Sequence, residues 1–159
     1  MSDEKWAAKH WLNVPGPFYT GDTDTCWTGR LHAPRHVLYG GRYQNEFIYR
    51  QPRTPDEIQS VREAGEQDPL DGYADDGDER WTPGAVRAWW HDRDKVVEHI
   101  TELIAEWTAG TRSDEPDAAE GGRDFLAYLA GDLEADLRAY VFRLENGRYP
   151  AASDRVPEL

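Results

Sequence analysis

Hydrophobic and polar positions change in pattern along the chain, from short apolar runs in the first third to helical spacing in the second half. Residues 37–39 (Val-Leu-Tyr) and 46–49 (Glu-Phe-Ile-Tyr) are strand-like runs around a Gly-containing segment at 40–45, which predicts a β-hairpin with a longer loop. Phe18 and Tyr19 form another short run that could pair beside it. A small antiparallel sheet is therefore expected here.

Helix start signals stand at three places. Ser2 can cap a short helix that ends before the turn residues at 13–17. Thr54-Pro55, with Glu57 placed to return the cap, predicts a helix that runs to about Ala64. Residues 65–80 are rich in Gly, Pro and acids, and they are predicted to form a loop.

Two long amphipathic helices are predicted in the second half of the chain. The first opens at Thr82-Pro83, and its apolar positions, spaced by three and four, are Val86, Trp90, Val97, Ile100, Ile104 and Trp107. After a break near 110–117, the second carries one stripe formed by Leu126, Leu129, Leu133, Leu137, Tyr140 and Leu144. Gly147 is expected to end it as a C-cap.

These elements predict an α+β fold in one domain that spans 1–159. The small antiparallel sheet, or β-hairpin, of the N-terminal third should pack against the two long antiparallel helices of the C-terminal half. Residues 1–55 would hold the short helix and the sheet, and residues 56–159 would be helical and acidic. A chain of 159 residues is long enough to bury a core of this kind.

The net charge of -13 is unevenly distributed, because residues 1–55 are slightly basic and residues 56–159 are strongly acidic. Such a field repels nucleic acid and anionic membranes and attracts basic partners. No stretch reads as a secretion leader or a membrane span, so a cytoplasmic location is expected. The preference for Arg over Lys, with abundant Ala, Gly and Asp, suggests a bacterial source.

One candidate site for chemistry lies in the loop that contains the single cysteine. Its residues are Cys26, His32, His36, Asp22 and Asp24, all of them types that bind zinc. The alternatives are a Cys–His nucleophilic pair, or a buried free cysteine beside surface histidines with no cofactor. The spacing matches no zinc-finger pattern, so the expectation is that no cofactor is bound, with zinc as the alternative.

A second candidate is the acidic segment that follows the first capped helix. Its carboxylates are Asp68, Asp71, Asp75, Asp76, Asp78 and Glu79. Clustered carboxylates with glycine turns suit Ca²⁺ or Mg²⁺, but the segment does not fit the register of an EF-hand loop. A docking surface for a basic protein partner is the favoured interpretation.

The basic residues of the first third also allow two interpretations. They are Arg30, Arg35, Arg42, Arg50 and Arg53, interleaved with aromatic residues. They could form a small anion site. The favoured interpretation is internal, with arginines of the sheet paired to the acidic helices that cover it.

The segments Gly16–Asp22 and Trp81–Pro83 resemble short acidic actinobacterial proteins of unsettled function, and the whole chain resembles bacterial immunity proteins and antitoxins in its general character. That resemblance implies a non-catalytic protein that sequesters or neutralises a basic protein partner. A metal-dependent or Cys-dependent enzyme built on the Cys26 loop is the second hypothesis. An accessory subunit of a larger complex, recognisable by an exposed apolar patch, is the third.

Overall fold

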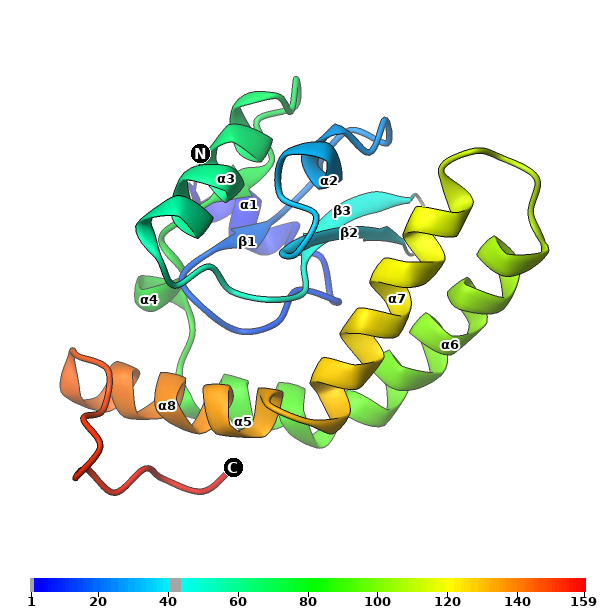
Figure 1. Cartoon of the computed structure of the whole chain (residues 1–159). Helices are drawn as coiled ribbons and strands as arrows, with labels where there is room; N and C mark the ends of the chain where they lie inside the picture. The colour runs from blue at the N-terminus through cyan, green and yellow to red at the C-terminus, as the bar shows by residue number, and fades with distance from the viewer. Residues whose placement is uncertain (1, 41–43) are drawn as a thin grey trace.

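The computed structural model describes residues 2–40 and 44–159, and it is an α+β fold, as the sequence predicts. A mixed N-terminal part lies beside an arc of longer helices (Figure 1). The elements in chain order are α1 (Ser2–Ala7), β1 (Tyr19–Thr20), α2 (Thr28–His32), β2 (Val37–Gly40), β3 (Asn45–Ile48), α3 (Pro55–Glu66), β4 (Tyr73–Ala74), α4 (Gly77–Arg80), α5 (Pro83–His91), α6 (Arg93–Ala109), α7 (Glu115–Ala130) and α8 (Leu133–Asn146). Gly41, Arg42 and Tyr43, which belong to the predicted hairpin loop and, for Arg42, to the predicted basic set, lie outside the described residues.

The predicted hairpin is confirmed. Strands β2 and β3 pair antiparallel, with Val37 opposite Ile48 and Leu38 opposite Phe47. Val37 and Ile48 pack with α3 in a smaller core, whereas Leu38 and Phe47 belong to the main core beneath the helical arc. Both faces of the hairpin are therefore covered, which explains why its strands read as continuous apolar runs.

Strand β1 does not join the hairpin but pairs with β4, inside the stretch that was predicted to be a loop. Side chains rather than a strand satisfy the outer edge of β3. The N–H of Ile48 donates to Asn13 Oδ1 at 2.9 Å, and the N–H of Glu46 donates to Thr23 Oγ1 at 2.8 Å. The hydroxyl of Thr20 in turn donates to the Glu46 carbonyl at 2.7 Å. These bonds leave no ladder position for β1, which instead meets β4.

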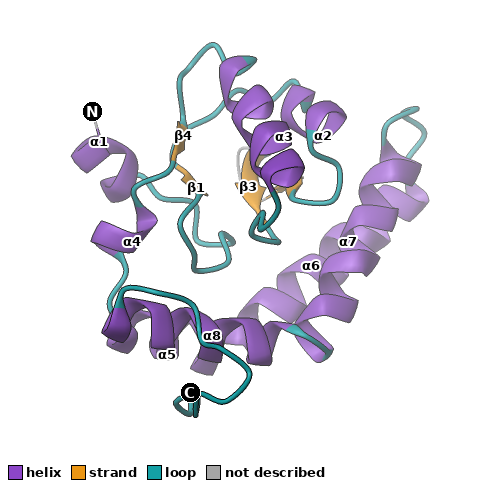
Figure 2. Cartoon of the chain, turned by 60° about the vertical axis from the view of Figure 1, so that its left-hand side comes forward, coloured by secondary structure: helices purple, strands orange, loops and turns teal. Residues whose placement is uncertain are grey.

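The prediction of two long C-terminal helices is wrong in one respect, because each is interrupted once. Helices α5 and α6 meet at Asp92, and α7 and α8 meet at 131–132. Helix α6 packs against α7, and α5 packs against α8, so the two breaks lie at matching places (Figure 2). The paired helices thereby bend together and follow the curved surface of the N-terminal part.

The break at Asp92 also changes which residues of α6 are buried. Val97, predicted to face the core, is 37% exposed, whereas Val96 is buried. In a helix that continued unbroken from α5, the buried side would stay on one line of the helix surface, and the interruption rotates that line.

At the other end of the chain, Trp6 packs against the main core, while Trp11 is 45% exposed.

Two helix ends follow the predicted signals closely, whereas α1 begins at Ser2 itself and already ends at Ala7. Thr54 and Glu57 form the complete capping box of α3, which runs two residues further than predicted, to Glu66. Gly147 caps α8 with φ of 75°, in the left-handed region that favours glycine. No helix in the described parts of the chain combines the length and hydropathy needed to cross a membrane.

Candidate functional site

The five residues of the predicted zinc site are dispersed. His36 is buried, and its Nδ1 lies 2.8 Å from the Arg50 carbonyl while its Nε2 lies 3.6 Å from Glu57. Cys26, His32 and Asp22 are exposed, and Asp24 is half-buried. Within residues 2–40 and 44–159, no group of three or more His, Cys, Asp or Glu is arranged to hold a metal ion. The structure therefore lends no support to zinc at these positions.

The cysteine itself is exposed, so the alternative of a buried free thiol is wrong. Its backbone N–H donates to Asp24 Oδ1 at 3.3 Å, and in the described structure no hydrogen bond joins its thiol to an imidazole. The next residue, Trp27, has φ of 62° and stacks on Tyr39, with their ring centroids 4.8 Å apart. Trp27 thus fastens this loop to the sheet and leaves Cys26 outside.

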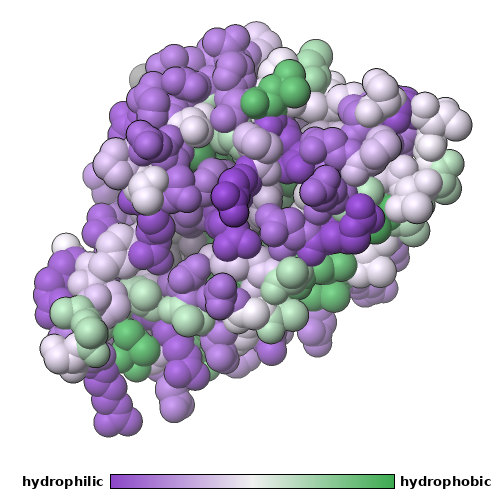
Figure 3. Space-filling view, in the orientation of Figure 1, coloured by the Kyte–Doolittle hydropathy of each residue, from purple (hydrophilic) through white to green (hydrophobic). Residues whose placement is uncertain are grey.

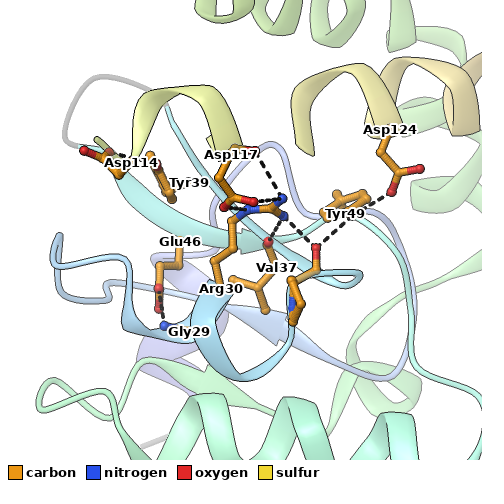
Figure 4. Close-up of polar contacts among 10 residues, drawn as sticks. Gly29, Arg30, Val37, Tyr39, Glu46, Tyr49, Asp114, Asp117 and Asp124 are labelled. Carbon is orange, nitrogen blue, oxygen red and sulfur yellow. Dashed lines mark hydrogen bonds and ion pairs between the residues drawn. The ribbon is translucent and has the colours of Figure 1, made fainter. Parts of the chain in front are cut away.

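Arginine and carboxylate side chains form a polar seam where α2 and the hairpin meet α7 (Figure 4). Arg30 Nε donates to Asp117 Oδ2 at 2.7 Å, and its Nη2 donates to the carboxylate and carbonyl of the same residue. Its Nη1 donates to the carbonyls of Pro34 and Val37. All five guanidinium N–H groups are thereby used, so Arg30 has no donor left for a ligand.

Other basic residues of the first third pair in the same way. Arg50 lies 3.8 Å from Asp124 of α7, and Arg53 lies 4.0 Å from Asp136 of α8. The geometry confirms the internal interpretation for Arg30, whereas Arg50 and Arg53 make longer, partly exposed pairs with the same helices. Pairing to the acidic helices, rather than an anion site, accounts for these three arginines.

Tyrosine hydroxyls donate hydrogen bonds to a further group of carboxylates. Among the described residues, six tyrosines donate to acids, in the pairs Tyr19–Asp76, Tyr39–Asp114, Tyr49–Asp124, Tyr73–Glu46, Tyr128–Asp136 and Tyr140–Asp78. Burial, together with the negative charge of each acceptor, raises the pKa of these tyrosines. Many of the acids are therefore committed inside the molecule.

Glu46 is the most deeply buried of these acceptors, with no exposed surface. Its Oε2 accepts from the Gly29 N–H at 2.7 Å and its Oε1 from the Tyr73 hydroxyl at 2.8 Å, and no ion pair joins it to a described cation. Burial raises its pKa to about 7, and these two hydrogen bonds only partly oppose that effect. Gly29 is required here, because a Cβ would collide with Tyr73 and Glu46.

The predicted partner-binding acids separate into internal and external groups. Asp68 is buried, and it accepts from the backbone N–H groups of Asp24, Leu70 and Gly72. Asp76 accepts from Tyr19 and Arg80, and Asp78 accepts from Tyr140 and Arg143. Asp71, Asp75 and Glu79 are the three that remain exposed.

A pocket of about 300 Å³ opens beside two of those exposed acids, between α3 and β4. We call it the α3–β4 pocket. Its acidic lining residues are Glu66, Asp71 and Asp75, and the one cation among its lining residues is Arg62. The ion pair between Arg62 and Asp75 is long, at 3.7 Å, and the side chains of both partners are more than half exposed. Exposed pairs of this kind bind weakly.

A second hollow of about 210 Å³ adjoins the first, since Asp71 lines both. It is lined by Glu4 and Asp22 and by Leu70, whose side chain is 60% exposed. Lys5 pairs with Asp71 at 3.3 Å. The two hollows and their carboxylates, Glu4, Asp22, Glu66, Asp71 and Asp75, are called the acidic face below. The surface over α3 is correspondingly hydrophilic (Figure 3).

The loop at the centre of the acidic face is held firmly. Asp68 ties it together from inside, and Gly72 sits so close to the Asp22 carbonyl that a Cβ there would collide with it. Asp71 has φ of 50°, a left-handed conformation that costs a non-glycine residue energy. Strained residues of this kind persist where surrounding contacts fix them, and they concentrate at binding sites.

Comparison with models of protein families, with curated proteins and with solved structures found no match.

Sequence reasoning did not single out the other residues of the α3–β4 pocket. Arg62 and Glu66 lie four residues apart on α3, but the helix was predicted to end at about Ala64, so Glu66 was placed in the loop and their shared face was missed. Tyr73 was placed in a loop, and its contact with α3 depends on β1 and β4 pairing. Glu46, an acid within an apolar strand run, was a visible anomaly that marked a buried carboxylate.

Proposed function

We propose that this protein is a non-catalytic binding protein that captures a basic protein partner on its acidic face, in the manner of immunity proteins and antitoxins. The observation that carries the proposal is the contrast in how acids are used. Along the seam, carboxylates are committed to Arg30 and to tyrosine hydroxyls, whereas Asp71 and Asp75 are exposed around two open hollows.

Electrostatics and shape support the same function. A cluster of exposed carboxylates attracts a cationic protein over a distance and speeds its association. The rigid loop around Asp71 means that little conformational entropy is lost on binding. Leu70, which lines the second hollow and is 60% exposed, offers apolar area on the face.

The test begins with native mass spectrometry of the tagged protein isolated gently from its source cells, which gives the mass of any co-purifying chain. Affinity for that chain is then measured by calorimetry at low and high salt. The decisive variant carries E66Q, D71N and D75N. The matched control carries E98Q, E102Q and E106Q on the exposed side of α6, and it changes the net charge by the same amount.

We expect the acidic-face variant to lose about tenfold or more in affinity and to show a weaker salt dependence, because local ion pairs are removed. The α6 control should lose far less. Equal losses in the two variants would mean that only total charge matters, and affinity that is insensitive to salt and to both variants would overturn the proposal.

A further inference from the structure

We propose that the α3–β4 pocket receives one arginine side chain of the basic partner, with its methylene groups inside and its guanidinium at the acidic mouth. This inference rests on the proposed function and specifies the chemistry that the acidic face recognises. In this proposal the pocket gives specificity for the partner's side chain, whereas the other carboxylates of the acidic face contribute electrostatic attraction.

The size and lining of the pocket suit a single long side chain. Its volume of about 300 Å³ lies at the small end of the range for ligand sites, too small for a large cofactor. The buried side chains Phe18 and Val61 line its inner part, together with Ala74. These apolar groups can cover the methylene carbons of an arginine.

Tyr73 favours arginine over lysine. Its hydroxyl is engaged by Glu46 at 2.8 Å, so the part of Tyr73 that remains for a ligand is the ring. Gly65 allows this ring to lie against α3, because a Cβ there would come within 3.0 Å of Tyr73 Cβ. A planar guanidinium stacks on such a ring and meets carboxylates in pairs, which a lysine ammonium does not do.

The acidic residues at the mouth of the pocket favour the binding of an additional cation. Glu66, Asp71 and Asp75 line the opening, and Arg62 is the single basic residue among its lining residues. Arg62 reaches Asp75 at 3.7 Å while its side chain stays 55% exposed, so this contact is long and open to solvent. Arg62 stands where the incoming guanidinium would bind and therefore competes with it.

This arrangement predicts opposite effects for two single changes. D75N removes an acceptor, so it should weaken binding of an arginine about two- to fivefold, the range for one exposed ion pair. R62Q removes the competing cation and should strengthen binding by a similar factor. Both side chains are largely exposed and neither belongs to a core, so both variants should fold.

The probe is the blocked tripeptide acetyl-Gly-Arg-Gly-amide, titrated into the ¹⁵N-labelled protein and followed by NMR. The corresponding citrulline peptide has nearly the same shape but no charge. The corresponding lysine peptide keeps the positive charge but lacks the planar guanidinium. We expect millimolar-range binding of the arginine peptide, on the order of 4 kcal/mol, with shifts centred on the amides of Gly65, Tyr73 and Asp75. The lysine peptide should bind more weakly, and the citrulline peptide should bind least.

Three results would overturn the pocket assignment: equal binding of the citrulline peptide, shifts spread over all exposed acids, or effects of D75N and R62Q in the same direction. Failure here is distinct from failure of the proposed function. If the partner depends on the acidic face while the peptide ignores the pocket, only this inference falls. If the peptide selects the pocket while the partner ignores the face, the proposed function falls.

Discussion

Carboxylates at the seam and on the acidic face differ in what surrounds them. At the seam, Asp117 holds the guanidinium of Arg30 at 2.7 Å, and Asp124 accepts from Tyr49 at the same distance. On the acidic face, Asp71 and Asp75 meet their cations at 3.3 and 3.7 Å. The two groups differ in these contacts and not in exposure, because the side chain of Asp117 is itself 62% exposed. The net charge of -13 does not distinguish these two groups of acids, and the contacts of each acid decide its role.

The test with the largest expected effect on stability replaces one arginine in each of the two regions. R30M removes a buried cation whose five N–H groups are all bonded, and it takes one donor away from each of the Pro34 and Val37 carbonyls. We expect a loss of about 3 kcal/mol in the free energy of unfolding. R62M, on the acidic face, should change it by less than about 0.5 kcal/mol.

Both values come from urea unfolding followed by tryptophan fluorescence, which reports on the seven Trp residues. Similar losses for the two variants would show that the seam and the acidic face do not differ as described.

A second test compares two glutamates by pH. Burial raises the pKa of Glu46 to about 7 from an ordinary value of 4.5, so the folded protein binds more protons than the unfolded chain between these values. The contribution of Glu46 to the free energy of unfolding is therefore greatest below about pH 4.5. This contribution is lost as the pH rises through about 7. The full loss is on the order of 3 kcal/mol.

E46Q removes this titration, so the difference in unfolding free energy between E46Q and the natural protein should grow by about that amount from pH 4.5 to pH 8. The matched control is E66Q, the same substitution at an exposed position of α3. A flat profile for E46Q would mean that Glu46 is not held as a buried acid.

The smallest effect concerns a single hydroxyl. Y49F deletes the donor to Asp124 and should lower the free energy of unfolding by about 1 kcal/mol. Tyr149 is the matched residue, because its ring lies against Arg53 and Arg143, and its hydroxyl makes no hydrogen bond in the described structure. Y149F should therefore be nearly neutral in chemical denaturation, and a larger effect than that of Y49F would reverse the assignment.

Local signals in the sequence predicted the fold well. The capping box at Thr54, the hairpin around residues 37–49 and the C-cap at Gly147 each depend on neighbours within a few residues, and all three are confirmed. The breaks at Asp92 and at 131–132 were not predicted. Each is short, and the apolar spacing in the sequence can be drawn as one continuous stripe across it, so only packing on a curved surface reveals it.

The site was less predictable because it depends on long-range pairing. The α3–β4 pocket joins Phe18, Arg62 and Asp75, which come together only when β1 meets β4. The acidic segment was recognised as a group, but composition cannot show that Asp68 lies inside while Asp71 lies outside. That division follows from backbone N–H groups that Asp68 bonds, which no spacing rule specifies.

The pairing of tyrosine hydroxyls with carboxylates also sets an alkaline limit on the fold. Free phenols lose their proton near pH 10, whereas the raised pKa of each paired tyrosine keeps it protonated in the folded protein. Above that pH the unfolded chain releases protons that the folded chain retains, so each pair adds to the drive toward unfolding. The near-ultraviolet absorbance band of tyrosinate would then appear as the protein unfolds. Its intensity would therefore report on unfolding directly.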